Sequence, residues 1–351
     1  MGKRATSLQD IADATGYSLM TVSRAIRGTG KVKEATAKKI FAKADELGYS
    51  YNPEISRMMS LMRSGHRDRY HENIALLWFT DPTTIRKNPH LNRIYQGALE
   101  RAVKLGYKVE SFHFDAYELK ARRVSEAIAS RGIRGVILFP LLQRKELVLS
   151  KLNMDWDQFT WVAFGNTHTN HEFHRVGHHH LFGMELAMQT LKKRGYKRPF
   201  LLISEGLDTT VHHAYGAGFL ANHPLGLREA LDYLYVGHMG WDELKATLIQ
   251  RRVDSLIMSQ DPHLVRYLRK GGLLIPGDLA ILSLHCLPSQ EVSGIDQCND
   301  ILGQYAVDMI VAQLHRQESG LPDNPKLMLH KGAWHEGATL SPAAHPAPMG
   351  D

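Results

Sequence analysis

Residues 7–28 read SLQDIADATGYSLMTVSRAIRG, and this stretch decides the fold of the N-terminal part of the chain. A first helix is predicted by apolar residues at helical spacing, namely Leu8, Ile11 and Ala12. Ser7 is the expected N-cap of this helix, with Asp10 at the capping-box position. Gly16 is expected to end it, because a residue without Cβ tolerates the left-handed conformation of a tight turn.

Two further helices are predicted directly after the first. Ser18 caps a helix over 19–26, whose inward face consists of Val22, Ala25 and Ile26. The next helix runs from about 34 to 47 and stops at Gly48. Two helices joined by a short glycine turn, with a third helix beside them, form the helix-turn-helix pattern.

The outer face of the second helix has the chemistry of a DNA-reading surface. Short hydroxyls and long cations, which suit phosphates and base edges, are found at Thr21, Ser23, Arg24 and Arg27. An arbitrary three-helix bundle is the alternative interpretation. Because the turn, the caps and the basic outer faces agree, the pattern favours DNA binding.

Net charge points to the same part of the chain. The 351 residues, enough for two or three domains, carry a net charge of +7. Residues 1–71 contain 13 Lys+Arg and 7 Asp+Glu, whereas residues 72–351 contain 30 and 29. A basic module on a nearly neutral body indicates a polyanion partner for the module alone, although a solubilising surface would also be basic.

The cysteines and the hydropathy exclude several classes of protein. Cys286 and Cys298 are the only cysteines, so no disulfide framework is expected and a reducing, cytoplasmic location is predicted. No stretch approaches 18 consecutive apolar residues, and the N-terminus has no apolar signal region. Secreted and membrane-spanning proteins are therefore set aside.

From residue 73 onward the pattern changes to strands alternating with helices. Strands are predicted at 74–79, 106–109, 135–139, 161–164, 199–204, 233–236, 255–259 and 280–284. Helices are predicted at 91–105, 122–131, 184–194, 215–222, 241–250 and 262–271. Buried strands in two batches, alternating with helices, predict α/β architecture with two doubly wound, parallel-sheet lobes and a central cleft.

The N-terminal motifs resemble the headpiece of the LacI/GalR family of transcriptional regulators. The resemblance rests on the run Ser18 to Arg24, followed by Leu47-Gly48-Tyr49 and by Asn52-Pro53. It implies that Leu19 and Met20 face base edges, and that Arg24 reaches bases or phosphate. Leu19 and Met20 cannot form strong hydrogen bonds, so discrimination would rest on apolar contacts such as those with thymine methyls.

The complete set of DNA contacts follows from the same resemblance. Thr21, Ser23 and Asn52 would touch the DNA backbone, and Lys33, at a position usually occupied by a capping residue, would contact phosphate. We predict contacts from Ser7, Leu19, Met20, Thr21, Ser23, Arg24, Arg27, Lys33, Asn52 and Met58.

A hinge helix is expected after Asn52-Pro53, over 54–62. It is too short to be stable alone in water. The resemblance implies that it folds against its dimer mate on DNA, where Met58 would take the place of a leucine that enters the minor groove. A methionine-rich linker helix that packs on the core is the alternative.

The remainder of the chain resembles the effector domain of the same family, which is shaped like a periplasmic binding protein. The clearest phrases are Leu105-Gly106-Tyr107, the run from Gly272 to Ile281, and the closing segment 334–339. The resemblance covers about 73–340 and implies two lobes joined by three crossings, with the chain switching lobes near Phe164 and Leu284. It also implies a small-molecule effector in the cleft, a carbohydrate or a derivative of one.

The expected effector contacts depart from the family pattern. Tyr215 stands at the position of an arginine, Gln260 at that of an asparagine and His285 at that of an aspartate, while Asp261 is retained. Tyr215, Gln260, Asp261 and His285 are our predicted effector contacts. Either the effector differs from the usual sugars, or the protein responds to no small molecule.

Histidine is unusually dense between residues 168 and 180. Six of the 20 histidines lie there: His168, His171, His174, His178, His179 and His180. Imidazoles can bind metals, yet the spacing matches no standard zinc pattern and no cysteine is near. Ordinary surface or cleft histidines are favoured, and no cofactor or metal is predicted.

These observations predict a transcriptional regulator and not an enzyme. The expected protein is a homodimeric repressor of a carbohydrate-utilisation operon, bound to a pseudo-palindromic operator. Its predicted domains are a headpiece (1–50), a hinge and basic linker (51–71), an effector-binding and dimerisation domain (72–340) and a disordered tail (341–351). A small-molecule binding protein of the same α/β fold is the alternative. An enzyme is disfavoured because no nucleophile elbow, Walker A or dinucleotide-binding phrase follows a strand; only Asp208 with His212 and His213 suggests acid–base groups.

Overall fold

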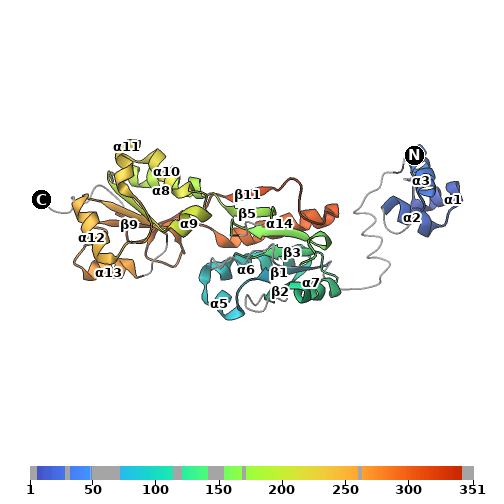
Figure 1. The fold of residues 1–351 in the computed structure, drawn as a ribbon, viewed down its shortest axis with the longest axis horizontal. Helices are drawn as coiled ribbons and strands as arrows, with labels where there is room; N and C mark the ends of the chain where they lie inside the picture. Colours follow the sequence, from blue (N-terminus) through green and yellow to red (C-terminus); the bar gives the residue numbers. More distant parts are fainter. Residues whose placement is uncertain are drawn as a thin grey trace. The chain divides into compact units, whose positions relative to one another are not determined.

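The protein consists of two compact units, Met1–Asp68 and Arg69–Asp351. The computed structural model describes residues 6–27, 32–47, 49, 72–113, 121–140, 154–167, 171–259 and 263–341 (Figure 1). The predicted hinge and almost all of the predicted tail lie outside these residues, so the domain boundaries remain predictions. Among the helices within the described ranges, none is long and apolar enough to cross a membrane.

The N-terminal unit contains the three predicted helices, α1 (Leu8–Thr15), α2 (Leu19–Arg27) and α3 (Glu34–Glu46). Ser7 caps α1 in a capping box: the Asp10 amide donates to the Ser7 hydroxyl, and the Ser7 amide donates to the Asp10 carboxylate at 2.7 Å. Gly16 ends α1 with a left-handed φ of 71°, and its amide donates to the Ala12 carbonyl. These local predictions are confirmed.

A small core holds the three helices together. Its buried residues, which come from all three helices, are Ile11, Ala12, Val22, Ala25, Ile40 and Ala44. The hydroxyl of Thr6 donates to the Leu47 carbonyl at 2.7 Å, which ties the start of the unit to the end of α3. Such a small core gives limited stability, so the caps matter more here than in a large domain.

Replacing Ser7 with alanine is expected to destabilise α1 by about 1 kcal/mol, because the Asp10 amide loses the hydroxyl that accepts from it. Amide exchange at Ile11 and Ala12 should become about fivefold faster in the full chain. The exposed residue Gln9 on the same helix provides the control, since Gln9→Ala removes no cap. Equal protection in the two variants would contradict the capping role.

The first lobe of the large unit is a six-stranded sheet in the order β11-β5-β4-β3-β1-β2, parallel throughout. Its strands are β1 (Glu72–Trp78), β2 (Tyr107–His113), β3 (Gly135–Leu138), β4 (Thr160–Phe164), β5 (His174–His178) and β11 (Leu327–His330). Its helical segments are α5 (Pro82–Lys87), α6 (Pro89–Lys104), α7 (Ala121–Ser130), η2 (Trp156–Gln158) and α14 (Asn299–Arg316).

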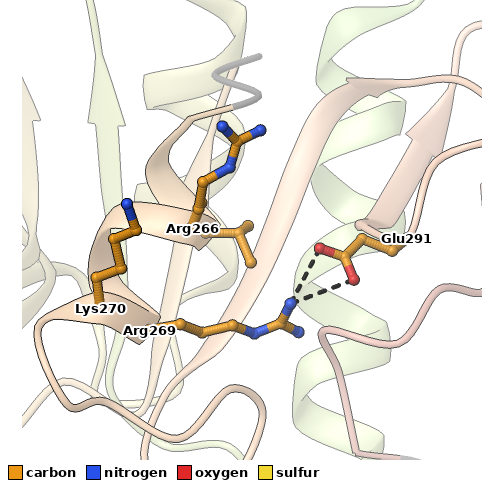
Figure 2. Close-up of a pocket in the computed structure, with 5 residues that line it drawn as sticks. Arg266, Arg269, Lys270 and Glu291 are labelled. Atoms are coloured by element: carbon orange, nitrogen blue, oxygen red, sulfur yellow. Dashed lines mark hydrogen bonds and ion pairs between the residues drawn. The ribbon is translucent and has the colours of Figure 1, made fainter.

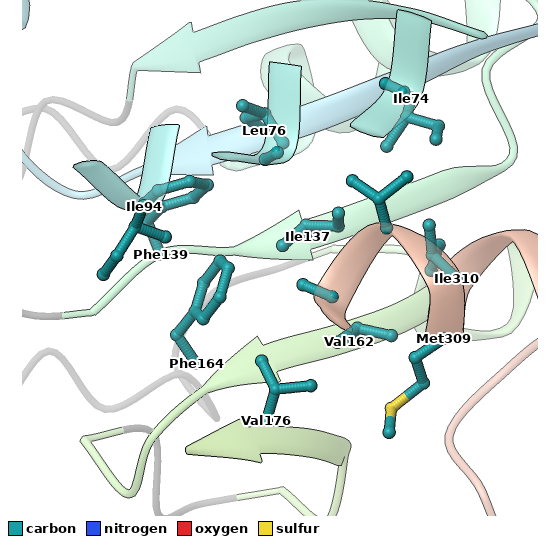
Figure 3. Close-up of a cluster of buried hydrophobic side chains, with 14 of the residues drawn as sticks. Ile74, Leu76, Ile94, Ile137, Phe139, Val162, Phe164, Val176, Met309 and Ile310 are labelled. Carbon is teal, nitrogen blue, oxygen red and sulfur yellow. The ribbon is translucent and has the colours of Figure 1, made fainter. Parts of the chain in front are cut away.

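Helices cover both faces of this sheet. Alternate strand residues Ile74, Leu76 and Ile137 pack with α6 and α14 in one core cluster (Figure 3). The intervening residues, such as Ala75 and Val136, pack with α7 and the segment around Trp161 in another. This alternation is what a doubly wound sheet buried on both faces requires.

The second lobe repeats the architecture in the order β12-β10-β9-β8-β6-β7, with β12 antiparallel at the edge. Its strands are β6 (Pro199–Ile203), β7 (Leu234–Val236), β8 (Ser255–Met258), β9 (Ala280–Cys286), β10 (Ser293–Asp296) and β12 (Ala333–His335). Its helical segments are α8 (His180–Lys193), α9 (Glu205–Thr210), α10 (Ala214–Asn222), α11 (Leu227–Ala230), η3 (Leu231–Tyr233), α12 (Trp241–Gln250) and α13 (Leu264–Lys270). The predicted two-lobed α/β fold is confirmed.

The chain crosses between the lobes three times, as predicted, but the predicted switch points are wrong. Phe164 ends β4, and Val176 of β5 pairs with it in the same sheet. Leu284 lies within β9, which pairs with β10 in the second lobe. The crossings lie at 178–180, 296–299 and 330–333. The strand β5 was not predicted, because histidines and a glycine interrupt its apolar pattern.

Helices α6 and α14 lie unusually close together in the first lobe. A Cβ on Gly303 would lie 2.6 Å from the backbone nitrogen of Ala98, and a Cβ on Gly97 would lie 2.6 Å from the carbonyl carbon of Asp300. Only glycine fits at these two positions, so the backbones of the two helices are in direct contact. This contact places the N-terminus of α14 beside that of α6, at the edge of the lobe where the crossings lie.

Candidate functional site

The exposed face of α2 is the candidate DNA-reading surface. Leu19 and Met20 are 41% and 63% exposed at its start, although both are apolar. Arg24 is exposed one turn further along, and Val22 and Ala25 face the core. Exposed apolar residues on a small folded unit indicate a contact surface.

The start of α2 is held by a local hydroxyl network. The Thr21 amide donates to the Ser18 hydroxyl at 3.2 Å, and the hydroxyls of Ser18 and Thr21 lie 2.8 Å apart. This confirms Ser18 as the residue that caps α2. Because the first turn of α2 contains no acidic residue, the positive end of its dipole is free to face an anion such as phosphate.

The other predicted DNA contacts have different positions. Lys33 is exposed before α3 and makes no side-chain capping bond. Ser7 is occupied in the capping box, and Ser23 is half-buried. Arg27 ends α2, while Asn52 and Met58 lie outside the described residues.

A second candidate site lies between the two lobes, where the predicted effector contacts Tyr215 and His285 come close together. The hydroxyl of Tyr215 is buried and hydrogen-bonded to His180 Nδ1 at 2.9 Å. The same hydroxyl accepts from Gln297 Nε2 at 3.1 Å, and Gln297 also donates to the Leu284 carbonyl. Burial raises the pKa of Tyr215 far above its ordinary value, so this phenol stays neutral. Gln260 and Asp261 lie outside the described residues.

Asn299, at the start of α14, connects three histidines. Its amide nitrogen donates to His90 Nδ1 at 3.4 Å and to His285 Nε2 at 3.3 Å. Its carbonyl oxygen accepts from His178 Nε2 at 3.0 Å. The His178 tautomer is thereby assigned, because the Asn299 oxygen can only accept. The other ring nitrogen, His178 Nδ1, is buried without a protein partner.

The imidazoles also contact each other directly. His90 of α6 packs on His285 of β9 with ring centroids 3.6 Å apart, which joins the two lobes. His178 lies 5.8 Å from His180 and 6.5 Å from His285. Burial lowers the pKa of His180 to about 4 and that of His285 to about 3, and it holds the pKa of His178 well below its ordinary value. Neighbouring imidazoles, and Arg93 near His285, add smaller effects in the same direction.

An ion-pair network lies beside the histidines. Arg93 of α6 forms a bidentate ion pair with Asp296 of β10, with N–O distances of 2.8 and 3.3 Å. The same guanidinium reaches Asp300 of α14 at 2.5 Å. Both carboxylates are therefore directed at Arg93, and the ion pair with Asp296 joins the two lobes.

The space left between these groups is very small. A cavity lined by His178, His180, Tyr215, Gln297 and Lys331, among others, has a volume of about 10 Å³. That volume holds about one water molecule. A larger hollow of about 420 Å³ lies elsewhere, on the surface of α13. It is lined by Arg266, Lys270 and the ion pair between Arg269 and Glu291 (Figure 2). Neither Tyr215 nor His285, the two predicted effector contacts that the structure describes, lines that surface.

The remaining histidines of the dense segment have separate structural roles. His174 Nδ1 accepts from the Lys326 amide at 2.9 Å, and His179 Nδ1 accepts from the Phe182 amide at the start of α8. His171 packs on Trp156 with centroids 4.6 Å apart, and His168 lies outside the described residues. Within the described ranges, no group of three or more His, Cys, Asp or Glu side chains is arranged to hold a metal.

Other polar groups offer little for catalysis. Burial raises the pKa of the Cys286 thiol to about 12, which keeps it protonated and a poor nucleophile. Asp208 accepts from His213 Nδ1 at 2.6 Å, but the His213 side chain is 72% exposed and lies at the N-cap of α10.

The sequence interpretation missed His90, Arg93, Gln297 and Asn299 as members of the inter-lobe site. Asn299 and Asp300 begin a helix that directly follows a strand, and this is a detectable signal for a polar strand end. His90 and Arg93 carried no such signal, because their role depends on residues about 200 positions away.

Comparisons with known proteins agree with this architecture. Residues 7–52 match the family described as bacterial regulatory proteins, lacI family. The chain is 24% identical over 350 residues to the Ribose operon repressor of Escherichia coli K12, covering 92% of this chain and 98% of that protein. It is 26% identical over 132 residues to the HTH-type transcriptional regulator DegA of Bacillus subtilis 168, covering 38% and 35%.

Two solved structures show the same fold. The complex of the transcriptional regulator CelR with cellobiose has a TM-score of 0.55 at 19% identity, covering 95% of this chain and 99% of that one. The lac repressor dimer bound to operator and the anti-inducer ONPF has a TM-score of 0.51 at 16% identity, covering 96% and 99%.

A helix-turn-helix headpiece followed by a two-lobed domain like a periplasmic binding protein defines a DNA-binding transcription regulator. Its headpiece is a helix-turn-helix domain of the lacI family, and the chain as a whole is similar to regulators of that family.

Proposed function

We propose that this regulator is a repressor that binds a pseudo-palindromic operator as a homodimer. The observation that supports this most is the exposed, acid-free start of α2, with Leu19, Met20 and Arg24 on its outer face. Two headpieces on one duplex require half-sites one helical turn apart, so dimer and palindrome are proposed together. The cytoplasm, predicted from the cysteine content, is the location that we propose.

The proposed division of labour follows the chemistry of the side chains. Leu19 and Met20 contact base edges through apolar groups, and Arg24 reaches a base or a phosphate. Thr21, Ser23, Arg27, Lys33 and Asn52 contact the backbone, where hydroxyl, amide and cationic groups suit phosphate oxygens. Ser7 acts near the DNA through its cap on α1, and Met58 is the proposed minor-groove wedge.

The regulated genes are proposed to serve carbohydrate utilisation, since the relative that aligns over 92% of the chain is the Ribose operon repressor. We propose that a small molecule acts at the inter-lobe site through Tyr215, His285, Gln260 and Asp261. The arginine and aspartate of the usual sugar sites are replaced here, so the effector differs from the family's usual sugars. A larger opening than the present cavity is needed to admit it.

A mobility-shift titration with the promoter region of the chain's own gene tests this function. We expect a sequence-preferring shift whose affinity falls steeply with salt, because phosphate contacts release counterions. A shuffled duplex of equal length is the control. Equal affinity for the two duplexes at moderate salt would reject the proposal and favour a small-molecule binding protein without a DNA-binding role.

A further inference from the structure

Four imidazoles from four elements meet where the two lobes are in contact. His90 comes from α6, His178 from the end of β5, His180 from the start of α8 and His285 from β9. They are joined by ring contacts of 3.6–6.5 Å, and the Asn299 amide bonds His90, His178 and His285. The cavity that His178 and His180 line has room for only about one water molecule. A closed interface of this kind has no room for the hydration shell that an imidazolium needs.

The charged groups around this cluster do not balance the positive charge that a protonated imidazole would carry. Asp296 of β10 and Asp300 of α14 are both engaged by Arg93 of α6. Lys331, after β11, lines the small cavity and adds a further cation. His330 of β11 is another imidazole near His178 and accepts from the Gly332 amide. The remaining polar partners, Tyr215, Gln297 and Asn299, are neutral.

We propose that neutral histidines latch the two lobes together, and that protonation of His178, His180 and His285 opens them, so that this regulator responds to acidification. The proposal rests on the proposed function only in its last step, the coupling to operator affinity. Opening itself is a property of the large unit and is measurable without DNA.

The direction of the effect follows from linkage. In the closed form the pKa is about 4 for His180, about 3 for His285 and well below its ordinary value for His178, whereas in an open, hydrated form each has an ordinary pKa of about 6.5. The open form therefore binds more protons, and closure is fully stable only above about pH 6.5. Between pH 7.5 and 5.5 each histidine should increase the opening constant about tenfold, giving up to about a thousandfold for three.

Cys286 provides a native reporter of opening. It follows His285, its thiol is buried, and Arg93 from the other lobe is close enough to influence its pKa. In the full chain with Cys298→Ser, the rate of labelling by a dithiodipyridine reagent is divided by the rate in denaturant at the same pH. This ratio corrects for thiol ionisation and should increase about a hundredfold to a thousandfold from pH 7.5 to 5.5. A change below about twofold would overturn the latch.

Two sets of variants identify the groups responsible. His285→Gln and His180→Gln should each reduce the pH response about tenfold, whereas His238→Gln, at an exposed histidine of the second lobe, should leave it unchanged. A full response in the double variant H180Q/H285Q would overturn the assignment to these imidazoles.

Asn299→Asp provides an independent test, because it adds a negative charge and does not depend on the stability of the glutamine variants. It places a carboxylate at the position that lies 3.0–3.4 Å from three imidazole nitrogens. The closed form should then tolerate imidazolium, and the pH response should fall at least tenfold. An undiminished response would contradict the latch.

Operator affinity measured at the same two pH values separates this inference from the proposed function. A pH-dependent labelling ratio together with a parallel change in operator affinity supports both. Loss of operator binding at every pH would reject the proposed function while the labelling result stands. A constant operator affinity with pH-dependent labelling would overturn the response of the regulator to acid.

Discussion

A chain with Arg24→Ala is expected to bind its operator about 1–3 kcal/mol more weakly, a loss of roughly 5–150-fold in affinity. Arg24 is exposed on the outer face of α2, one turn beyond Leu19 and Met20. An arginine in this position can donate two hydrogen bonds to a guanine or pair with a phosphate, and alanine can do neither. The measurement is a mobility-shift titration at fixed salt.

The pattern of the loss tells the two roles of Arg24 apart. A base contact lowers affinity for the operator and leaves affinity for unrelated DNA nearly unchanged, whereas a phosphate contact lowers both and reduces the salt slope by about 1. Lys43→Ala is the matched control, because Lys43 on α3 is paired with Glu46 at 2.7 Å. Affinity equal to that of the parent chain would show that Arg24 does not contact DNA.

Replacing Gly303 with alanine is expected to destabilise the large unit by about 3 kcal/mol. The added Cβ would overlap the backbone of α6, which cannot rotate away as a side chain can. With α6 and α14 forced apart, the cluster that contains Ile94, Leu302 and Ile310 loses its packing. Thermal unfolding should begin roughly 6–12 °C lower.

Gly206→Ala provides a control for the Gly303 variant. A Cβ on Gly206, in the first turn of α9, would meet no heavy atom within 4 Å, and its φ is not left-handed. Alanine there should be neutral or slightly stabilising, since it restricts the unfolded chain. If Gly303→Ala melts at the temperature of Gly206→Ala, the close helix contact does not contribute as described.

The headpiece could be predicted almost completely from the sequence, because its determinants are local. Ser7 with Asp10, the left-handed Gly16 and Ser18 each act within four residues, and all were found in their expected roles. The buried strands of the lobes were also predictable from continuous apolar runs such as 74–79. Elements with mixed composition were not predictable in this way. Strand β5 contains two histidines and a glycine. In α14 ten residues are buried, and its apolar residues are spread around the helix instead of forming one face.

The inter-lobe site was only partly predictable, for a different reason. Tyr215 and His285 were found because a family motif marks their positions. His90 and Asn299 are 209 positions apart in the sequence, and their contact exists only because Gly97 and Gly303 let two helices approach. A single sequence shows neither the approach nor the pairing.

The return of the chain to its first lobe has a consequence for biosynthesis. Helix α14 completes the core of that lobe and strand β11 the edge of its sheet, yet both are synthesised after the whole of β6–β10. As the protein leaves the ribosome, the second lobe can therefore close its central strands first. Until residues beyond 299 emerge, the apolar face of the first lobe that α14 covers is exposed. During that interval this face is the one that a chaperone would bind.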